Sequence, residues 1–213
     1  MKGGLFILFS IFFAACSDRK SDALKIPAGE GGTPSPNEAV ATFGEGCFWH
    51  TEIVFQSLQG VRDAVSGFSG GLEEDPSYQS VSRGGSQHAE TVNVYYDPSV
   101  ISFETLVKAF FASHDPTQLN RQGNDVGPQY RSIAFYRNET ERNIIENQIR
   151  ALEASGRYRQ KVVTEVKPFR RFYSAGDYHQ EYILNHPREL YVQAVSIPDY
   201  LHFRRNFKEA QFK

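Results

Sequence analysis

Residues 40–58 read VATFGEGCFWHTEIVFQSL, and this stretch decides the local fold. Val40 to Phe43 has the composition of a short β-strand, and apolar residues recur at helical spacing from Phe48 to Leu58. Gly44 and Gly46 lie between the two and mark a turn. The sequence therefore predicts a strand that passes through a glycine turn into a helix.

Cys47 lies at this junction and is the candidate nucleophile. A thiol at the start of a helix faces the positive end of the helix dipole, which favours thiolate over thiol. Phe48 and Trp49 follow directly, and we expect them to wall an apolar pocket around the sulfur. The imidazole of His50 either stabilises the thiolate or points outward from the helix, and we favour the outward orientation.

The rest of the chain alternates strands and helices. Strands are predicted at Val61–Phe68, Thr91–Tyr96, Ser132–Tyr136 and Val162–Val166, and helices at Phe103–Ser113 and Glu139–Ser155. Several connections are too short for parallel crossovers, which favours an α+β fold over a doubly wound sheet. We expect a two-layer sandwich with a ferredoxin-like βαβ core, long loops and an irregular C-terminal wrap.

The N-terminal region has the features of an export signal. Lys2 precedes an apolar stretch, Leu5 to Ala15, that is shorter than the ~20 residues of a spanning helix. The following Cys16 is similar to the lipidated cysteine of a bacterial lipoprotein, although an ordinary signal peptide is the alternative. We expect a signal peptide over 1–15, a flexible tether over 16–37, and an exported, membrane-tethered lipoprotein that faces the periplasm.

Residues 38–213 have the length of one catalytic domain that can bury a substantial core. The formal net charge is −2, and acidic and basic residues are interspersed. This gives no electrostatic footprint for nucleic acid. We expect a monomer.

Polar residues outside the cysteine turn supply further candidates. Glu90 precedes a strand; by itself it fits a solvated edge residue, but an apolar neighbourhood would raise its pKa and make it an acid. Tyr78, Tyr130 and Tyr182 carry hydroxyl donors in polar contexts, where the ordinary role is at a core edge. Asp125 is by default a turn former.

Six motifs, in the same order and at the same spacing, resemble the peptide methionine sulfoxide reductase A family. They are Gly46-Cys47-Phe48-Trp49, His88-Ala89-Glu90, His114-Asp115-Pro116-Thr117-Gln118, Arg121-Gln122-Gly123-Asn124-Asp125, Gln129-Tyr130-Arg131-Ser132 and Tyr178-His179-Gln180-Glu181-Tyr182. The resemblance runs from about Ala41 to the C-terminus.

The resemblance implies reduction of the S epimer of methionine sulfoxide, free or within oxidised proteins and peptides. The Cys47 thiolate would attack the sulfoxide sulfur, release methionine and become a sulfenic acid. Glu90 would protonate the oxygen, with Tyr78 and Tyr130 as hydrogen-bonding partners and Tyr182 as a third hydroxyl.

The resemblance also implies binding residues. Phe48 and Trp49 would hold the terminal methyl group of the substrate, and Asp125 and His179 would contact its backbone. No bound cofactor or metal is implied.

The segment 185–213 holds no cysteine that could resolve the sulfenic acid. Regeneration would therefore need an external thiol, such as a thioredoxin-like protein, or dithiothreitol in vitro.

Two other functions remain open at this point. Cys47 could react with peroxide directly, as in a thiol peroxidase or redox sensor. Alternatively, the chain could be a tethered binding lipoprotein that has lost turnover, a reading favoured only by the unusual His50.

Overall fold

The computed structural model describes residues 33–213. The predicted signal peptide, Cys16 and most of the predicted tether lie outside the described residues. Within residues 33–213, no helix is both long enough and apolar enough to span a membrane.

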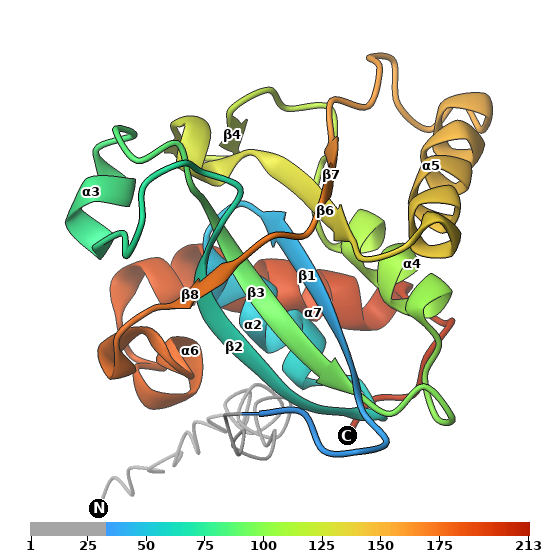
Figure 1. Ribbon diagram of the computed structural model, residues 1–213, viewed down its shortest axis with the longest axis horizontal. Coiled ribbons are helices and arrows are strands. Elements are labelled where there is room, and N and C mark those ends of the chain that lie inside the picture. The colour runs from blue at the N-terminus through green and yellow to red at the C-terminus, as the bar shows by residue number, and fades with distance from the viewer. Residues whose placement is uncertain (1–32) are drawn as a thin grey trace, which may run out of the picture.

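One mixed sheet forms the centre of the described chain, with the strand order β7-β6-β1-β3-β2-β8. Its members are β1 (Ala39–Glu45), β2 (Val61–Ser69), β3 (Ala89–Tyr96), β6 (Ser132–Tyr136), β7 (Glu165–Pro168) and β8 (Phe172–Ser174). All neighbouring pairs are antiparallel except β6 and β7. Strands β1, β3 and β2 run side by side in Figure 1.

The core of the sheet is ferredoxin-like. β3 lies between β1 and β2 and is antiparallel to both, so β1 and β2 are parallel and are joined by α2 (Phe48–Gln56). β6 lies on the other side of β1, and α4 (Phe103–Ser113) is the helix between β3 and β6 in the chain. The two split βαβ units interlock in this way. The predicted α+β core is confirmed.

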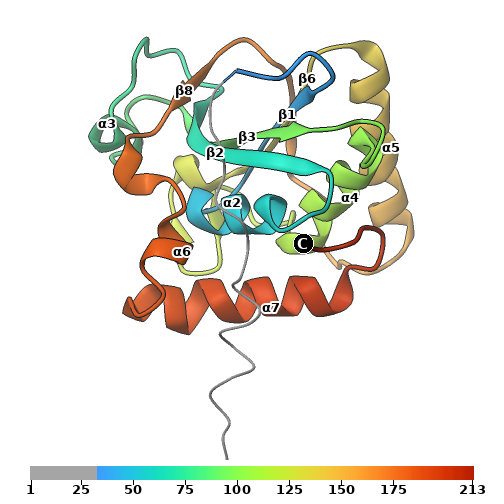
Figure 2. The ribbon, with the colours of Figure 1, turned by 90° about the horizontal axis from the view of Figure 1, so that it is seen from below.

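The helices form layers on one side of the sheet. α2 and α4 lie beneath it, and α7 (Ile197–Asn206) lies across their outer side in Figure 2. α5 (Glu139–Ala154) packs beside α4. The C-terminal residues return to the core, where Phe212 bridges to Leu58.

Short elements complete the described chain. They are α3 (Tyr78–Ser82), β4 (Arg121–Gln122), β5 (Asp125–Val126), the 3-10 helices η1 (Pro128–Tyr130) and η2 (Asp177–His179), α6 (Tyr182–Asn185) and the π-helix η3 (Val192–Ser196).

Two sequence expectations about the C-terminal part were wrong. The last predicted strand begins at Glu165 and not at Val162, because the Val163 N–H donates to the Pro116 carbonyl, 2.8 Å away, outside the sheet. The wrap is helical from 192 to 206, with Tyr200 and Phe203 buried. Tyr200 and Phe203 are buried against α2 and α4, and the periodicity of the local sequence carries no information about these distant helices.

Phe43 is the centre of the hydrophobic core. Its ring stacks on Phe55 and on Phe110, with 5.2 Å between centroids in each pair, and on Phe103 at 6.1 Å. The side chain is fully buried. Phe43 therefore joins β1 to both helices of the ferredoxin-like core.

We predict that Phe43→Ala lowers the free energy of unfolding by about 3–5 kcal/mol, because it opens a cavity between β1, α2 and α4. Urea denaturation followed by circular dichroism measures this change. Leu72→Ala, at a side chain that is 79% exposed, is the control and should leave stability nearly unchanged. Equal losses in the two variants would contradict the assignment of Phe43 to the core.

Candidate active site

The backbone turn before Cys47 requires glycine. Gly46 has φ +121°, and a Cβ there would lie 2.8 Å from Cβ of Gln122. Cys47 follows as the N-cap of α2, with extended backbone angles. Since N-cap residues flank the unpaired N–H groups of the first helical turn, the thiol is held at the start of the helix as predicted.

A cavity of about 180 Å³ opens on Cys47. Its lining comes from segments far apart in the sequence: Cys47, Phe48, Trp49, Tyr78, Glu90, Asp125, Tyr130 and Tyr191. The fold thus gathers most of the predicted site residues at one end of β3 and α2. The cavity combines aromatic walls with one thiol and two carboxyl groups.

Glu90 is a buried acid. Its side chain is 2% exposed, so the alternative of a solvated edge residue was wrong. Oε2 accepts a hydrogen bond from the Phe48 N–H, 3.1 Å away, and burial raises the pKa of Glu90 to about 8. A carboxyl group with this pKa is mostly protonated at pH 7 and can donate a proton.

Gly44 allows β3, the strand that carries Glu90, to lie close to β1. A Cβ at Gly44 would lie 2.6 Å from the Glu90 carbonyl oxygen. Larger residues would separate β1 from β3 at the point where these strands deliver Cys47 and Glu90. The glycine therefore sets the closeness of the thiol and the acid.

The structure corrects the expected charge of Cys47. Burial raises the pKa of the thiol well above 9, and the nearby Glu90 carboxyl acts in the same direction. The Trp49 and His50 N–H groups lower this pKa, as the helix-dipole argument expects, but they are the weaker effect. Burial therefore favours the thiol in the resting site, and the helix N-terminus does not outweigh it.

Two tyrosines face the acid and the thiol. Burial raises the pKa values of Tyr78 and Tyr130, and the charges of Glu90 and Cys47 raise them further. Both hydroxyls therefore stay protonated near neutral pH and can donate hydrogen bonds into the cavity.

Tyr191 is a cavity residue that the sequence did not indicate. Its hydroxyl donates to Oδ2 of Asp125 at 2.6 Å, and both side chains line the cavity. The tyrosine precedes the π-helix η3, about 140 residues after Cys47. No local pattern around Tyr191 marks it, because its role depends on a partner from β5.

The motifs at 114–118 and 121–125 build the loop that carries Asp125. Asp115 holds the loop by accepting from the Thr117 N–H and hydroxyl, at 3.0 and 2.7 Å. The Gln122 side-chain amide bonds both backbone groups of Asp115, and Gln118 accepts from the Gly123 N–H. These polar residues therefore act as a frame behind the site.

His179 and Tyr182 lie outside the wall of this cavity. Tyr182 stacks on Trp49, with 3.6 Å between centroids and 7° between planes, and its hydroxyl pairs with that of Tyr178 at 3.4 Å. His179 packs on Tyr78, with 4.3 Å between centroids, and on Phe48. The two residues support the aromatic wall from behind.

The side chains of Gln180 and Glu52 fix this supporting segment. Gln180 donates to the Ser66 and Ala175 carbonyls and accepts from the Ser66 N–H. Glu52 on α2 accepts from the Glu181 N–H and from the Ser66 hydroxyl. Together they tie residues 180–181 to β2 and α2.

His50 does not point away from the site. Its two ring nitrogens are buried, and it lines a second cavity of about 300 Å³ that also reaches Cys47. The favoured outward orientation was therefore wrong.

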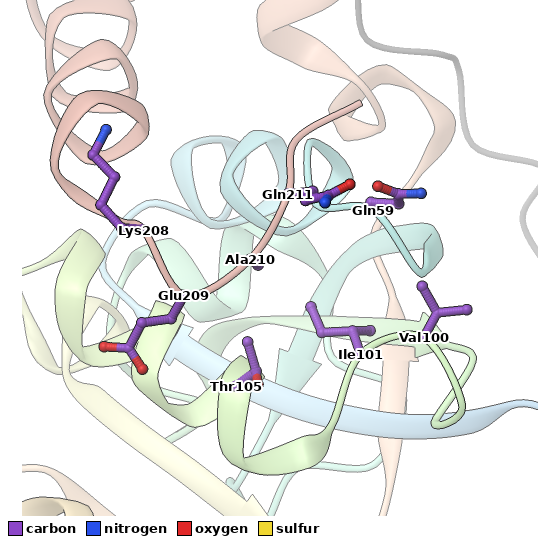
Figure 3. Close-up of a pocket in the computed structure, with 8 residues that line it drawn as sticks. All are labelled: Gln59, Val100, Ile101, Thr105, Lys208, Glu209, Ala210 and Gln211. Carbon is purple, nitrogen blue, oxygen red and sulfur yellow. The ribbon is translucent and has the colours of Figure 1, made fainter.

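A larger cavity, of about 440 Å³, lies at a different place in the fold. It is formed by Gln59, Val100, Ile101, Thr105 and the C-terminal residues 208–211, as Figure 3 shows. This lining contains neither a thiol nor a histidine. The two smaller cavities at Cys47 are therefore the candidate site.

The chain is similar in sequence to known enzymes. The family model described as peptide methionine sulfoxide reductase matches residues 39–211. The chain is 47% identical over 172 residues to peptide methionine sulfoxide reductase MsrA 1 of Rhodopirellula baltica, covering 81% of this chain and 88% of that protein. It is 44% identical to an MsrA of Natronomonas pharaonis, covering 80% of this chain and 96% of that protein.

Solved structures show the same fold. Methionine sulfoxide reductase A of Corynebacterium diphtheriae gives a TM-score of 0.66 at 32% identity and covers 76% of this chain and 89% of that chain. Mxr1 of Saccharomyces cerevisiae in reduced form gives 0.65 at 30% identity, with coverage of 74% and 91%.

We predict that alkylation of Cys47 by iodoacetamide is slow at pH 7 and rises above pH 9, because the thiol pKa is raised. Glu90→Gln should move the rise to lower pH, since it removes a repelling carboxylate. Mass spectrometry of the Cys47 peptide measures the rate, and Glu74→Gln on the surface is the control. A rate that is already maximal at pH 7 would contradict the raised pKa.

We also predict that stability falls as pH rises from 6.5 to 8. Burial raises the pKa values of Glu45, Glu52 and Glu90 to about 8, so the folded chain holds protons that the unfolded chain has released above pH 4.5. His114, with a pKa lowered to about 4, acts in the opposite direction only below pH 6.5.

Each proton changes the slope by at most about 1.4 kcal/mol per pH unit. Urea unfolding at pH 6.5, 7.0, 7.5 and 8.0 measures the slope, and Glu52→Gln should make it shallower. A free energy of unfolding that stays level or increases over this range would disprove the assignment of buried, neutral carboxyl groups.

Proposed function

Because the chain belongs to the peptide methionine sulfoxide reductase family, it is an oxidoreductase that reduces methionine sulfoxide, and we propose that Cys47 and Glu90 carry the reaction. One observation supports these roles above all others. A thiol and a neutral carboxyl group share a small, aromatic-walled cavity.

The first step transfers one oxygen atom. The sulfur of Cys47 attacks the sulfoxide sulfur, Glu90 donates its proton to the sulfoxide oxygen, and the proton that leaves the thiol restores the neutral Glu90 carboxyl group. The bond between the substrate sulfur and oxygen breaks, and an S–O bond forms on Cys47. The products are methionine and a sulfenic acid, so the substrate sulfur is reduced and the Cys47 sulfur is oxidised.

The cavity walls supply orientation. Phe48 and Trp49 offer an apolar surface to the terminal methyl group, while the Tyr78 and Tyr130 hydroxyls can donate to the sulfoxide oxygen beside Glu90. A chiral sulfoxide fits with its methyl on the aromatic wall and its oxygen at the acid in only one epimer. We assign this fit to the S epimer, free or in oxidised proteins and peptides, with Asp125 toward the substrate backbone.

An external thiol regenerates Cys47 in this proposal. The sequence holds only two cysteines, Cys16 and Cys47, and Cys47 is free in the structure. A thioredoxin-like protein is the proposed natural reductant, and dithiothreitol replaces it in vitro. The product of the first thiol attack is a mixed disulfide, which a second thiol opens.

We place the enzyme on a membrane surface of a bacterial cell. The proposal is lipidation of Cys16 after removal of residues 1–15, a tether over 16–37, and a monomeric catalytic domain facing the periplasm. It rests on the sequence of residues 1–37 alone.

The two other functions considered from the sequence are not favoured. A thiol peroxidase does not need an aromatic wall for a methyl group, and a lapsed binding protein does not need a buried acid beside an intact thiol.

We predict that the purified full chain with dithiothreitol converts the S epimer of a methionine sulfoxide peptide and leaves the R epimer. Cys47→Ser should abolish conversion, because it removes the nucleophile. Glu90→Gln should slow the first turnover roughly a hundredfold through loss of the acid. Chromatography of the released methionine peptide measures each rate.

Glu74→Gln, an exposed acid-to-amide change, is the matched control and should keep the full rate. Less than tenfold loss in Cys47→Ser, or consumption of hydrogen peroxide in preference to the sulfoxide, would refute the assigned chemistry.

A further inference from the structure

Cys47 also borders the second cavity, whose character differs from that of the first. The cavity measures about 300 Å³, and most of the residues that line it are polar. Its lining comprises Glu45, Cys47, His50, Ser113, residues 122–125, Tyr191, residues 194–196 and Asp199. The reaction proposed above uses neither Glu45 nor His50.

Several polar atoms at this cavity are buried and unpartnered. Both ring nitrogens of His50 lack a hydrogen-bond partner, as does Oε1 of Glu45. Glu45 is 1% exposed, and its other oxygen accepts from the Ser113 hydroxyl at 2.7 Å. A buried polar group without a partner is destabilising, because it has given up its hydrogen bonds to water. A polar ligand that bonded to these atoms would remove that cost.

The two cavities share Cys47 but extend along different residues. Both are bordered by the hydrogen-bonded pair Asp125 and Tyr191, but the first continues along Phe48, Trp49 and Glu90 and the second along Glu45 and His50. A sulfenic oxygen taken from a sulfoxide lies in the first cavity. Because displacement at sulfur runs in line, the attacking group must arrive from a different side.

We propose that the polar cavity is the entry site for the thiol that regenerates Cys47, and that His50 accepts the proton of this thiol. The inference rests on the proposed function, since it concerns the second half of the same catalytic cycle. The proposal assigns a role to His50 and to the second cavity, which the sulfoxide does not occupy.

The step balances with the thiol as the only co-reactant. The incoming thiol gives its proton to His50, and its sulfur forms an S–S bond with Cys47. The S–O bond of the sulfenic acid breaks, and the leaving hydroxide takes the Glu90 proton to form water. Each incoming thiol sulfur is oxidised to the disulfide level. A second thiol then attacks the outer sulfur of the mixed disulfide, releases a disulfide and gives its proton to Cys47. Exchange with solvent removes the proton from His50 and returns one to Glu90.

The surroundings of His50 suit a proton acceptor. Burial lowers the pKa of His50, so its imidazole is neutral and has a free lone pair near pH 7. The Asp199 carboxylate and the backbone groups of Ser113 and Ser196 act in the opposite direction and stabilise the imidazolium that forms during the step. Asp125 and Asp199 also give the cavity acidic walls, which favour a thiol that carries a positive charge over an anionic one.

The experiment separates the two halves of the cycle. Reduced enzyme without reductant is mixed with a methionine-S-sulfoxide peptide, and the burst of methionine gives the rate of the first half. The sulfenic enzyme is then mixed with cysteamine, and mass spectrometry of the quenched protein follows the Cys47 mixed disulfide. His50→Ala should slow the second rate at least tenfold and leave the first within threefold.

Added imidazole should restore the second rate in His50→Ala, which a purely structural loss would not allow. The control is His202→Ala, an exposed histidine on α7, which should behave like the parent. A second-half rate in His50→Ala within threefold of the parent overturns the proposal. A methionine burst rate in His50→Ala that falls as much as the second-half rate also overturns the proposal.

A second variant leaves both His50 and Cys47 in place. Ala194 lines the cavity and is exposed, so Ala194→Trp should fill the entrance and slow the reaction with cysteamine at least fivefold. 3-Mercaptopropionate, matched for thiolate concentration, should react more slowly than cysteamine in the parent, and Asp199→Asn should narrow the difference. Equal rates for the two thiols, or no effect of the tryptophan, count against entry through this cavity.

The source of the thiol is tested with a reduced thioredoxin in place of cysteamine. If His50→Ala slows the reaction with thioredoxin as much as the reaction with cysteamine, a protein thiol uses the cavity. If the rate with thioredoxin is unchanged, only small thiols use it. Failure of the proposed function is distinguishable, because the parent would then give no methionine burst. The sulfenic acid could still be formed with hydrogen peroxide, and the second half could be measured alone.

Discussion

The hydrogen bond from the Phe48 N–H to the Glu90 carboxyl group is the interaction on which the site depends. It joins the first turn of α2 to the start of β3, and these elements carry the nucleophile and the acid. Since one oxygen of Glu90 accepts this bond, the other can carry the proton toward the cavity. Gly44 and Gly46 make the approach possible, because side chains at these positions would meet the Glu90 backbone or Gln122.

Burial at this junction affects both reacting groups in the same direction. It raises the pKa of Glu90 to about 8 and the pKa of Cys47 well above 9, so the resting site holds both protons. The acid is thereby ready to donate, whereas the nucleophile must lose its proton during the attack on the substrate. A neutral resting thiol is also less open to stray oxidation than an exposed thiolate.

The two sides of Cys47 differ in chemistry. The side of Phe48 and Trp49 is aromatic and contains the acid that a sulfoxide needs, whereas the side of His50 is polar and contains a base. The hydrogen-bonded pair Asp125 and Tyr191 borders both. This division suits a cycle in which the Cys47 sulfur attacks the sulfoxide in the first step. In the next step an incoming thiol attacks the Cys47 sulfur.

The sequence alone determined the elements with strong local patterns: the helix at 103–113 and the strand at 132–136 are observed with the predicted bounds. Its motifs also named Cys47, Glu90 and the aromatic pair. The tertiary structure decided the protonation of Cys47, the inward orientation of His50, the role of Tyr191 and the helical C-terminus. The physical reason is that periodicity and capping report on neighbours along the chain. Burial, charge and hydrogen-bond partners come from segments that only folding brings together.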